Sequence, residues 1–137
     1  MRPALLIVLA LCLATHAIAA DKWGAVAFSA RTRNAGTAHD WPAKKAAGDE
    51  ALKQCAATGA KDCVLAVAYR GESCASIAVV DLDKRPLRWG AAVAAKLMEA
   101  QDASLVVCSK KTHRKCGYPI LDICGSEKLP SWHITND

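Results

Sequence analysis

Short apolar and polar blocks alternate at the start of the mature part of the chain. The run Trp-Gly-Ala-Val-Ala-Phe-Ser at 23–29 is typical of a strand. The polar segment 30–36 contains Asn34 and Gly36, which are both turn formers. These residues predict a hairpin that returns through 37–40.

A helix is expected directly after this hairpin. Asp40 can accept hydrogen bonds from free amide groups, and Pro42 is tolerated in a first helical turn. From Ala43 onward, alanines recur at steps of four and end in Cys55, which is the period of a helix with one buried face. Gly59 ends the pattern.

The second half offers a similar series of elements. Its apolar runs are separated by polar segments that are typical of turns. The expected elements are strands at 64–69 and 74–80, a helix at 91–101 and a closing strand at 105–108, with turns at 70–73 and 81–86.

The order hairpin, helix, strand therefore occurs twice, which predicts an internal ββαβ duplication of roughly fifty residues. Trp41 and Ala43 before the first helix are echoed by Trp89 and Ala91 before the second. We expect an α+β fold, stabilised by disulfides, with a mainly antiparallel sheet and two helices on one face.

The N-terminus has the features of a secretory signal peptide. Arg2 precedes an apolar run at 4–14, which is too short to span a bilayer as a helix. The Ala17-Ile18-Ala19 sequence is a small-x-small cleavage pattern. We therefore expect a signal peptide at 1–19, an α+β domain at 20–109 and a tail at 110–137, with no transmembrane segment in the mature chain.

Cleavage after Ala19 leaves six of the seven cysteines. An even number in a short exported chain predicts disulfides, although six cysteines allow fifteen pairings. No two lie close enough for a C-x2-C zinc motif, so we expect no metal site. Positions relative to the expected elements favour the pairs Cys55–Cys63, Cys74–Cys108 and Cys116–Cys124, the last of which would staple the tail to itself.

The net charge of +5 falls to about +4 without Arg2, and a basic run lies late in the chain. Such a run is usually a solvated loop. Three polar loops are nevertheless the best candidates for an interaction surface. Their residues are Arg70 and Glu72; Asp81, Asp83, Lys84 and Arg85; and Lys110, Lys111, His113, Arg114 and Lys115.

Catalytic chemistry finds little support in the sequence. A ribonuclease-like site would need two histidines and a lysine around a phosphate, which His113, His133 and Lys110 or Lys111 could supply. No G-x-S-x-G, H-E-x-x-H or P-loop pattern is present, and the mature cysteines are expected to be paired. We expect no cofactor and no catalytic residue, with a small basic hydrolase as the alternative.

Several motifs carry a resemblance to a known family. They are the opening run at 23–29, the helix ending in Leu-Lys-Gln-Cys at 52–55, Asp-Cys-Val at 62–64, Cys-Ala at 74–75 and Val-Val-Cys-Ser at 106–109. In this order they resemble domain-of-unknown-function family 4189, whose members are small exported bacterial proteins with disulfides. The second half departs from the pattern, because its expected helix is shorter and carries no cysteine that matches Cys55.

The resemblance implies a periplasmic or secreted protein without an established catalytic site. Some members of the family resemble immunity or inhibitor proteins that neutralise antibacterial effectors. We therefore expect a non-catalytic protein that binds a protein partner, such as an effector or an envelope-degrading enzyme. Few aromatic residues accompany the modest positive charge, so nucleic acid is not expected as a partner, while weak binding to the anionic cell envelope stays an alternative.

Overall fold

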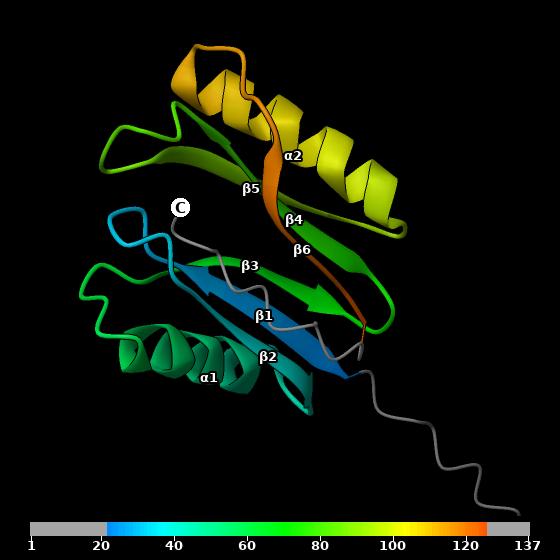
Figure 1. Ribbon diagram of the computed structural model, residues 1–137. Helices are drawn as coiled ribbons and strands as arrows, with labels where there is room; N and C mark the ends of the chain where they lie inside the picture. The colour runs from blue at the N-terminus through cyan, green and yellow to red at the C-terminus, as the bar shows by residue number, and fades with distance from the viewer. Residues whose placement is uncertain (1–21, 126–137) are drawn as a thin grey trace, which may run out of the picture.

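The structure is a computed structural model that describes residues 22–125. Within this range the order ββαβ occurs twice (Figure 1). The first repeat forms a three-stranded antiparallel sheet in the order β2-β1-β3, and the second forms one in the order β5-β4-β6. The elements are β1 (Trp23–Phe28), β2 (Ala35–Trp41), α1 (Lys44–Ala57), β3 (Val64–Arg70), β4 (Cys74–Val80), β5 (Arg88–Ala94), α2 (Leu97–Thr112) and β6 (Pro119–Cys124).

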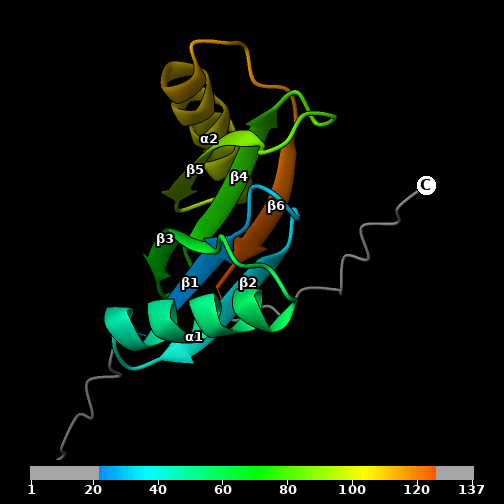
Figure 2. The ribbon, with the colours of Figure 1, turned by 90° about the vertical axis from the view of Figure 1, so that its left-hand side faces the viewer.

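The two sheets pack face to face and each carries its own helix on the outer side, which gives four layers (Figures 1 and 2). Alternating side chains of the central strands decide this arrangement. Val26 and Phe28 of β1 meet Ile77 and Val79 of β4 in the core between the sheets. The small residues between them, such as Ala27, face the helices instead.

The α+β class, the antiparallel pairing and the duplication are therefore confirmed, but the expected placement of both helices on one face is not what the chain adopts. A strand such as β4 is buried along its whole length, so it needs cover on both faces. Two separate sheets provide this cover by packing against each other and against one helix each.

Close approach of helix to strand is the clearest mark of the duplication. Gly36 of β2 is paired with Ala27, and Gly90 of β5 is paired with Ala78. A Cβ atom on either glycine would collide with helix backbone, at Ala51 and Cys55 in α1 or at Val107 and Cys108 in α2. Cys108 is therefore the counterpart of Cys55, contrary to the expectation that the second half lacks one.

The second half differs from the predicted elements. The expected helix at 91–101 is wrong, because 91–94 belongs to β5, and the expected strand at 105–108 lies within α2. Alanine-rich composition suggested a helix at 91–94, whereas pairing with β4 makes it a strand. The buried face of α2 consists of small residues, so the apolar pattern did not reveal it; its members are Ala100, Ser104, Cys108 and Thr112.

Residues assigned to the tail also take part in the fold. Residues 110–112 complete α2, and β6 pairs antiparallel with β4 to complete the second sheet. Trp41 and Trp89 are not equivalent in the two repeats, contrary to expectation, because Trp41 ends β2 while Trp89 lies near the start of β5.

The structure pairs all six cysteines of the described range. The Cys55–Cys63 bridge is confirmed, whereas the predicted Cys74–Cys108 and Cys116–Cys124 bridges are wrong. The observed bonds are Cys74–Cys124, between neighbouring strands, and Cys108–Cys116. Cys55–Cys63 and Cys108–Cys116 have the same sequence separation of 8, and each ties a helix end to the loop before the last strand of its repeat.

Two expectations fall outside this description. The signal peptide at 1–19 and His133 lie beyond residues 22–125. Neither of the two helices in the described range is long and apolar enough to cross a lipid bilayer.

Candidate functional site

Four loops meet at one end of the four-layer fold (Figure 1). They are 29–34 and 58–63 of the first repeat and 81–87 and 113–118 of the second. Because the repeats have the same topology, equivalent loops from both reach the same end. We call these loops, with the last turn of α2 and Arg88 at the start of β5, the basic loop end.

Charge is distributed very unevenly between the two ends. The basic loop end holds ten of the protein's eighteen lysines and arginines but only three of its thirteen acidic residues. This is a formal excess of seven positive charges on one surface, larger than the net charge of the chain. The cations are Arg31, Arg33, Lys61, Lys84, Arg85, Arg88, Lys110, Lys111, Arg114 and Lys115, and the acids are Asp62, Asp81 and Asp83.

Backbone contacts hold the loops of the two repeats together. The Leu87 amide donates to the Ala30 carbonyl at 2.8 Å. Arg33 reaches across from the first repeat and donates to the Leu82 carbonyl. Loops 29–34 and 81–87 therefore form one continuous surface although they are distant in sequence.

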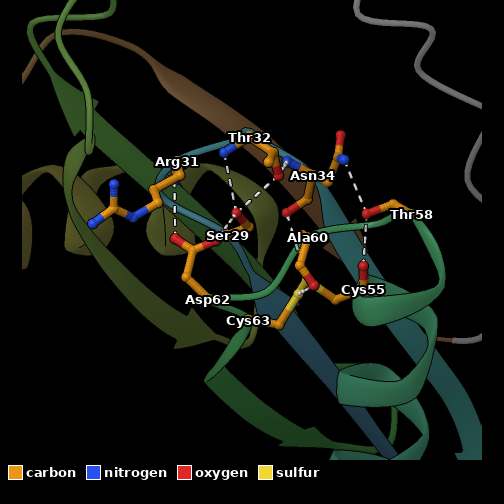
Figure 3. The surroundings of a disulfide bond; sticks show 9 residues. All are labelled: Ser29, Arg31, Thr32, Asn34, Cys55, Thr58, Ala60, Asp62 and Cys63. Atoms are coloured by element: carbon orange, nitrogen blue, oxygen red, sulfur yellow. Dashed lines mark hydrogen bonds between the residues drawn. A yellow bond between two sulfur atoms is a disulfide. The ribbon is translucent and has the colours of Figure 1, made fainter.

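The first repeat braces its loops around the Cys55–Cys63 bridge (Figure 3). Asp62, one residue before Cys63, accepts a hydrogen bond from the buried Ser29 hydroxyl at 2.5 Å and one from the Arg31 amide at 3.1 Å. These bonds favour the carboxylate form, and the Ser29 bond is the main reason why the pKa of Asp62 lies below its ordinary value.

The second repeat uses an ion-pair cluster between the equivalent loops. One oxygen of Asp81, Oδ2, lies 2.8 Å from Arg114 Nη1, 3.5 Å from Lys84 Nζ and 4.0 Å from Arg88 Nη2. The loop before β5 is thereby tied to the loop before β6. A single carboxylate compensates only one of these three positive charges.

Exposed apolar side chains lie at the same end. Leu82 at the tip of its loop is 45% exposed, and Tyr118 before β6 is 81% exposed. Val64 at the start of β3 is 48% exposed. The surface therefore offers some apolar contact area among its charges, including an exposed tyrosine, a residue that is enriched in protein interfaces.

The structure brings two of the three predicted loops together. Asp81 to Arg85 and Lys110 to Lys115 meet at the basic loop end. The Arg70–Ser73 turn does not join them, because it lies at the opposite end, where the Gly71 amide donates to the Lys22 carbonyl. Arg70 stacks there on Trp23, with its guanidinium carbon 4.8 Å from the ring centroid.

Sequence reasoning missed four cations of this surface. Arg31, Arg33, Lys61 and Arg88 are isolated in sequence, so no local charge run marks them. The signal that could have found them was the duplication itself. Once 29–34 and 81–87 are recognised as equivalent hairpin loops, their charges are expected at the same end of the fold.

The histidines of the described range lie far apart in the fold. His113 ends α2 at the basic loop end with a left-handed backbone. His39 lies in β2 near the opposite end, with its Nδ1 atom 2.9 Å from the Tyr69 hydroxyl and 3.1 Å from the Gly125 carbonyl oxygen. Burial raises the pKa of Tyr69, so this phenol stays protonated. The two imidazoles do not form a joint acid–base site.

These features define a class of protein: a duplicated ββαβ scaffold, braced by three disulfides, that presents a cationic loop surface. The chain belongs to the family described as domain of unknown function DUF4189, whose model matches residues 23–124 and thus both repeats. The chain matches no curated protein and no solved structure.

Proposed function

We propose that this chain is an exported, non-catalytic binding protein that docks its basic loop end on an acidic surface of another protein. The observation that carries the proposal is the excess of ten cations over three carboxylates at this end. Such a field accelerates encounter with an acidic partner and disfavours basic ones.

A folded protein fits this surface better than a simple polyanion. A polyanion requires little more than positive charge, whereas protein interfaces favour exposed tyrosine and arginine at their centres. Tyr118 and Leu82 lie among five arginines at the basic loop end. An anionic envelope polymer would make little use of these apolar groups.

Rigid presentation also supports docking. Disulfides close the loops of both repeats, and the Ser29–Asp62 and Asp81–Arg114 contacts fix the chain between them. Loops that are ordered before binding lose little conformational entropy on docking, so more of the contact energy remains as affinity.

We further propose that the partner is an antibacterial effector or an envelope-degrading enzyme, which makes this chain an immunity or inhibitor protein of the periplasm or the cell exterior. The disulfides favour an oxidising compartment of this kind. The N-terminal signal pattern supports export, and the family resemblance supports the immunity role.

Protection of bacterial cells tests this proposal. Co-expression of the exported chain should rescue cells from a co-expressed periplasmic effector, and Arg31→Glu, Lys110→Glu and Lys115→Glu together should abolish rescue. Lys45→Glu, Lys53→Glu and Lys96→Glu together form the matched control, because these three exposed lysines lie outside the basic loop end. Rescue that survives the first triple change, or turnover of RNA or peptidoglycan by the purified protein, would contradict the proposal.

A further inference from the structure

A hollow of about 330 Å³ opens between loop 81–87, the start of β5 and the loop that follows α2. Its size lies at the low end of the range of about 300–1,000 Å³ for small-ligand pockets, which leaves ample room for one side chain. Val80 and Pro86 provide apolar wall, and the charged lining consists of Asp81, Lys84, Arg85, Arg88 and Arg114.

The cations of this hollow are only partly neutralised. Arg114, Lys84 and Arg88 all approach the same Asp81 oxygen, and their side chains are still 50%, 66% and 49% exposed. Arg85 forms no ion pair with any residue in 22–125. Four cations and one carboxylate therefore leave an excess of three positive charges facing the hollow.

Arg85 is also held in place. Its Nη1 atom donates to the Leu82 carbonyl at 2.6 Å and to the Lys84 carbonyl at 2.8 Å. Both hydrogen bonds use one nitrogen, and a guanidinium has five donors, so the other side of the group can still bind an anion. A planar guanidinium fixed in this way is suited to a carboxylate, which it can bind through two parallel hydrogen bonds.

We infer that this hollow is a pocket for the carboxylate of a single aspartate or glutamate side chain on the partner protein. The inference rests on the proposed function and adds the group that is recognised. The Asp81–Arg114 contact shows that these cations already bind a carboxylate. An unmodified protein surface carries its negative charge as carboxylates, and the planar guanidinium of Arg85 matches a carboxylate, so an aspartate or glutamate of the partner is the expected occupant.

Binding of a blocked tetraglutamate peptide tests this inference. In heteronuclear NMR of the disulfide-intact protein, the peptide should produce saturable shifts in the amides of 81–88 and in the Arg85 side-chain Nε–H signal. Blocked tetraglutamine should produce none. Arg85→Gln should weaken tetraglutamate binding at least fivefold, while Lys96→Gln, which removes one positive charge outside the basic loop end, should weaken it less than twofold.

Each other outcome counts against the pocket. Equal losses in Arg85→Gln and Lys96→Gln, or no saturation, would show that the peptide responds only to the overall charge of the protein. Either result would overturn the pocket while leaving the proposed docking surface intact. If inorganic phosphate binds more tightly than the peptide and displaces it, the hollow is a phosphoryl site and the assignment to a carboxylate is wrong. Failure of the proposed function has a different readout, because cells would then still be rescued by the variant in which Arg31, Lys110 and Lys115 are changed to glutamate. Arg85→Lys keeps the charge but lacks the planar guanidinium. Its affinity for tetraglutamate should lie between those of the wild type and Arg85→Gln, which tests the carboxylate pocket even if Arg85→Gln folds poorly.

Discussion

Removal of one hydroxyl from a buried serine pair should destabilise this protein more than removal of the other. The Ser76 hydroxyl of β4 and the Ser104 hydroxyl of α2 lie 3.1 Å apart and are fully buried. Ser104 also donates to the Gln101 carbonyl at 2.8 Å, so in this pair Ser76 is the donor and Ser104 the acceptor. Ala25 and Ala51 occupy the equivalent positions in the first repeat.

The two single changes therefore leave different groups unsatisfied. Ser104→Ala leaves the buried Ser76 hydroxyl without its acceptor, which should lower the free energy of unfolding by about 1–3 kcal/mol. Ser76→Ala leaves Ser104 bonded to its own helix and should cost only about 0.5–1.5 kcal/mol. The double change recreates the alanine pair of the first repeat and should cost less than Ser104→Ala alone.

Guanidinium chloride unfolding of the four proteins, with the disulfides intact, measures these differences as shifts of the transition midpoint at constant slope. The double-mutant cycle gives the coupling energy of the pair. Costs that simply add, or a larger loss for Ser76→Ala than for Ser104→Ala, would refute the assigned direction of the hydrogen bond and the equivalence of the two repeats.

Three further predictions concern crosslinks, pH and catalysis. Replacing Cys74 and Cys124 by serine should lower the free energy of unfolding by about 4 kcal/mol, and replacing Cys55 and Cys63 should lower it by about 2.5 kcal/mol, because the first bridge spans a sequence separation of 50 and the second only 8. Equal shifts of the denaturant midpoint in the two variants would contradict this difference. The pKa of Asp62 is lowered on folding, so the ionised carboxylate stabilises the folded state above the ordinary pKa of 3.8, and this stabilisation is lost as the pH falls through the folded pKa. Asp62→Asn should therefore reduce the acid-induced fall of the melting temperature. A melting temperature that depends on pH as in the wild type would contradict this prediction. His39→Ala and His113→Ala should each leave protection of cells at the wild-type level, and loss of protection in a stably folded variant would revive the hydrolase alternative.

Local signals were sufficient for much of the first repeat and for its disulfide. Alanines at steps of four ending in Cys55 gave the first helix because its buried face is a regular stripe. The loop from Cys55 to Cys63 is short enough for the bridge to follow from the order of elements. The first helix and its disulfide both depend on residues that are close in sequence, so the sequence pattern was sufficient to predict them.

The second repeat depends on contacts between distant residues. Residues 91–94 have a helical composition but form β5 because β4 pairs with them, and the buried face of α2 includes Ser104 and Thr112, which an apolar pattern does not detect. The misplaced Cys108 then led to two wrong disulfides. The same dependence hid the basic loop end, because Arg33 and Asp81 reach it from loops that only the packing of two sheets brings together.

The central claim is that partner binding takes place through the basic loop end, and the affinity of a purified partner tests it most directly. The probe is a purified effector from which co-expression of the chain rescues cells. Its dissociation constant should rise at least tenfold for the Arg31→Glu, Lys110→Glu and Lys115→Glu variant and change less than twofold for the Lys45→Glu, Lys53→Glu and Lys96→Glu variant. The difference between the two variants should grow as salt is lowered, because exposed charges are then less screened. Equal affinity for both variants at low salt would contradict the account.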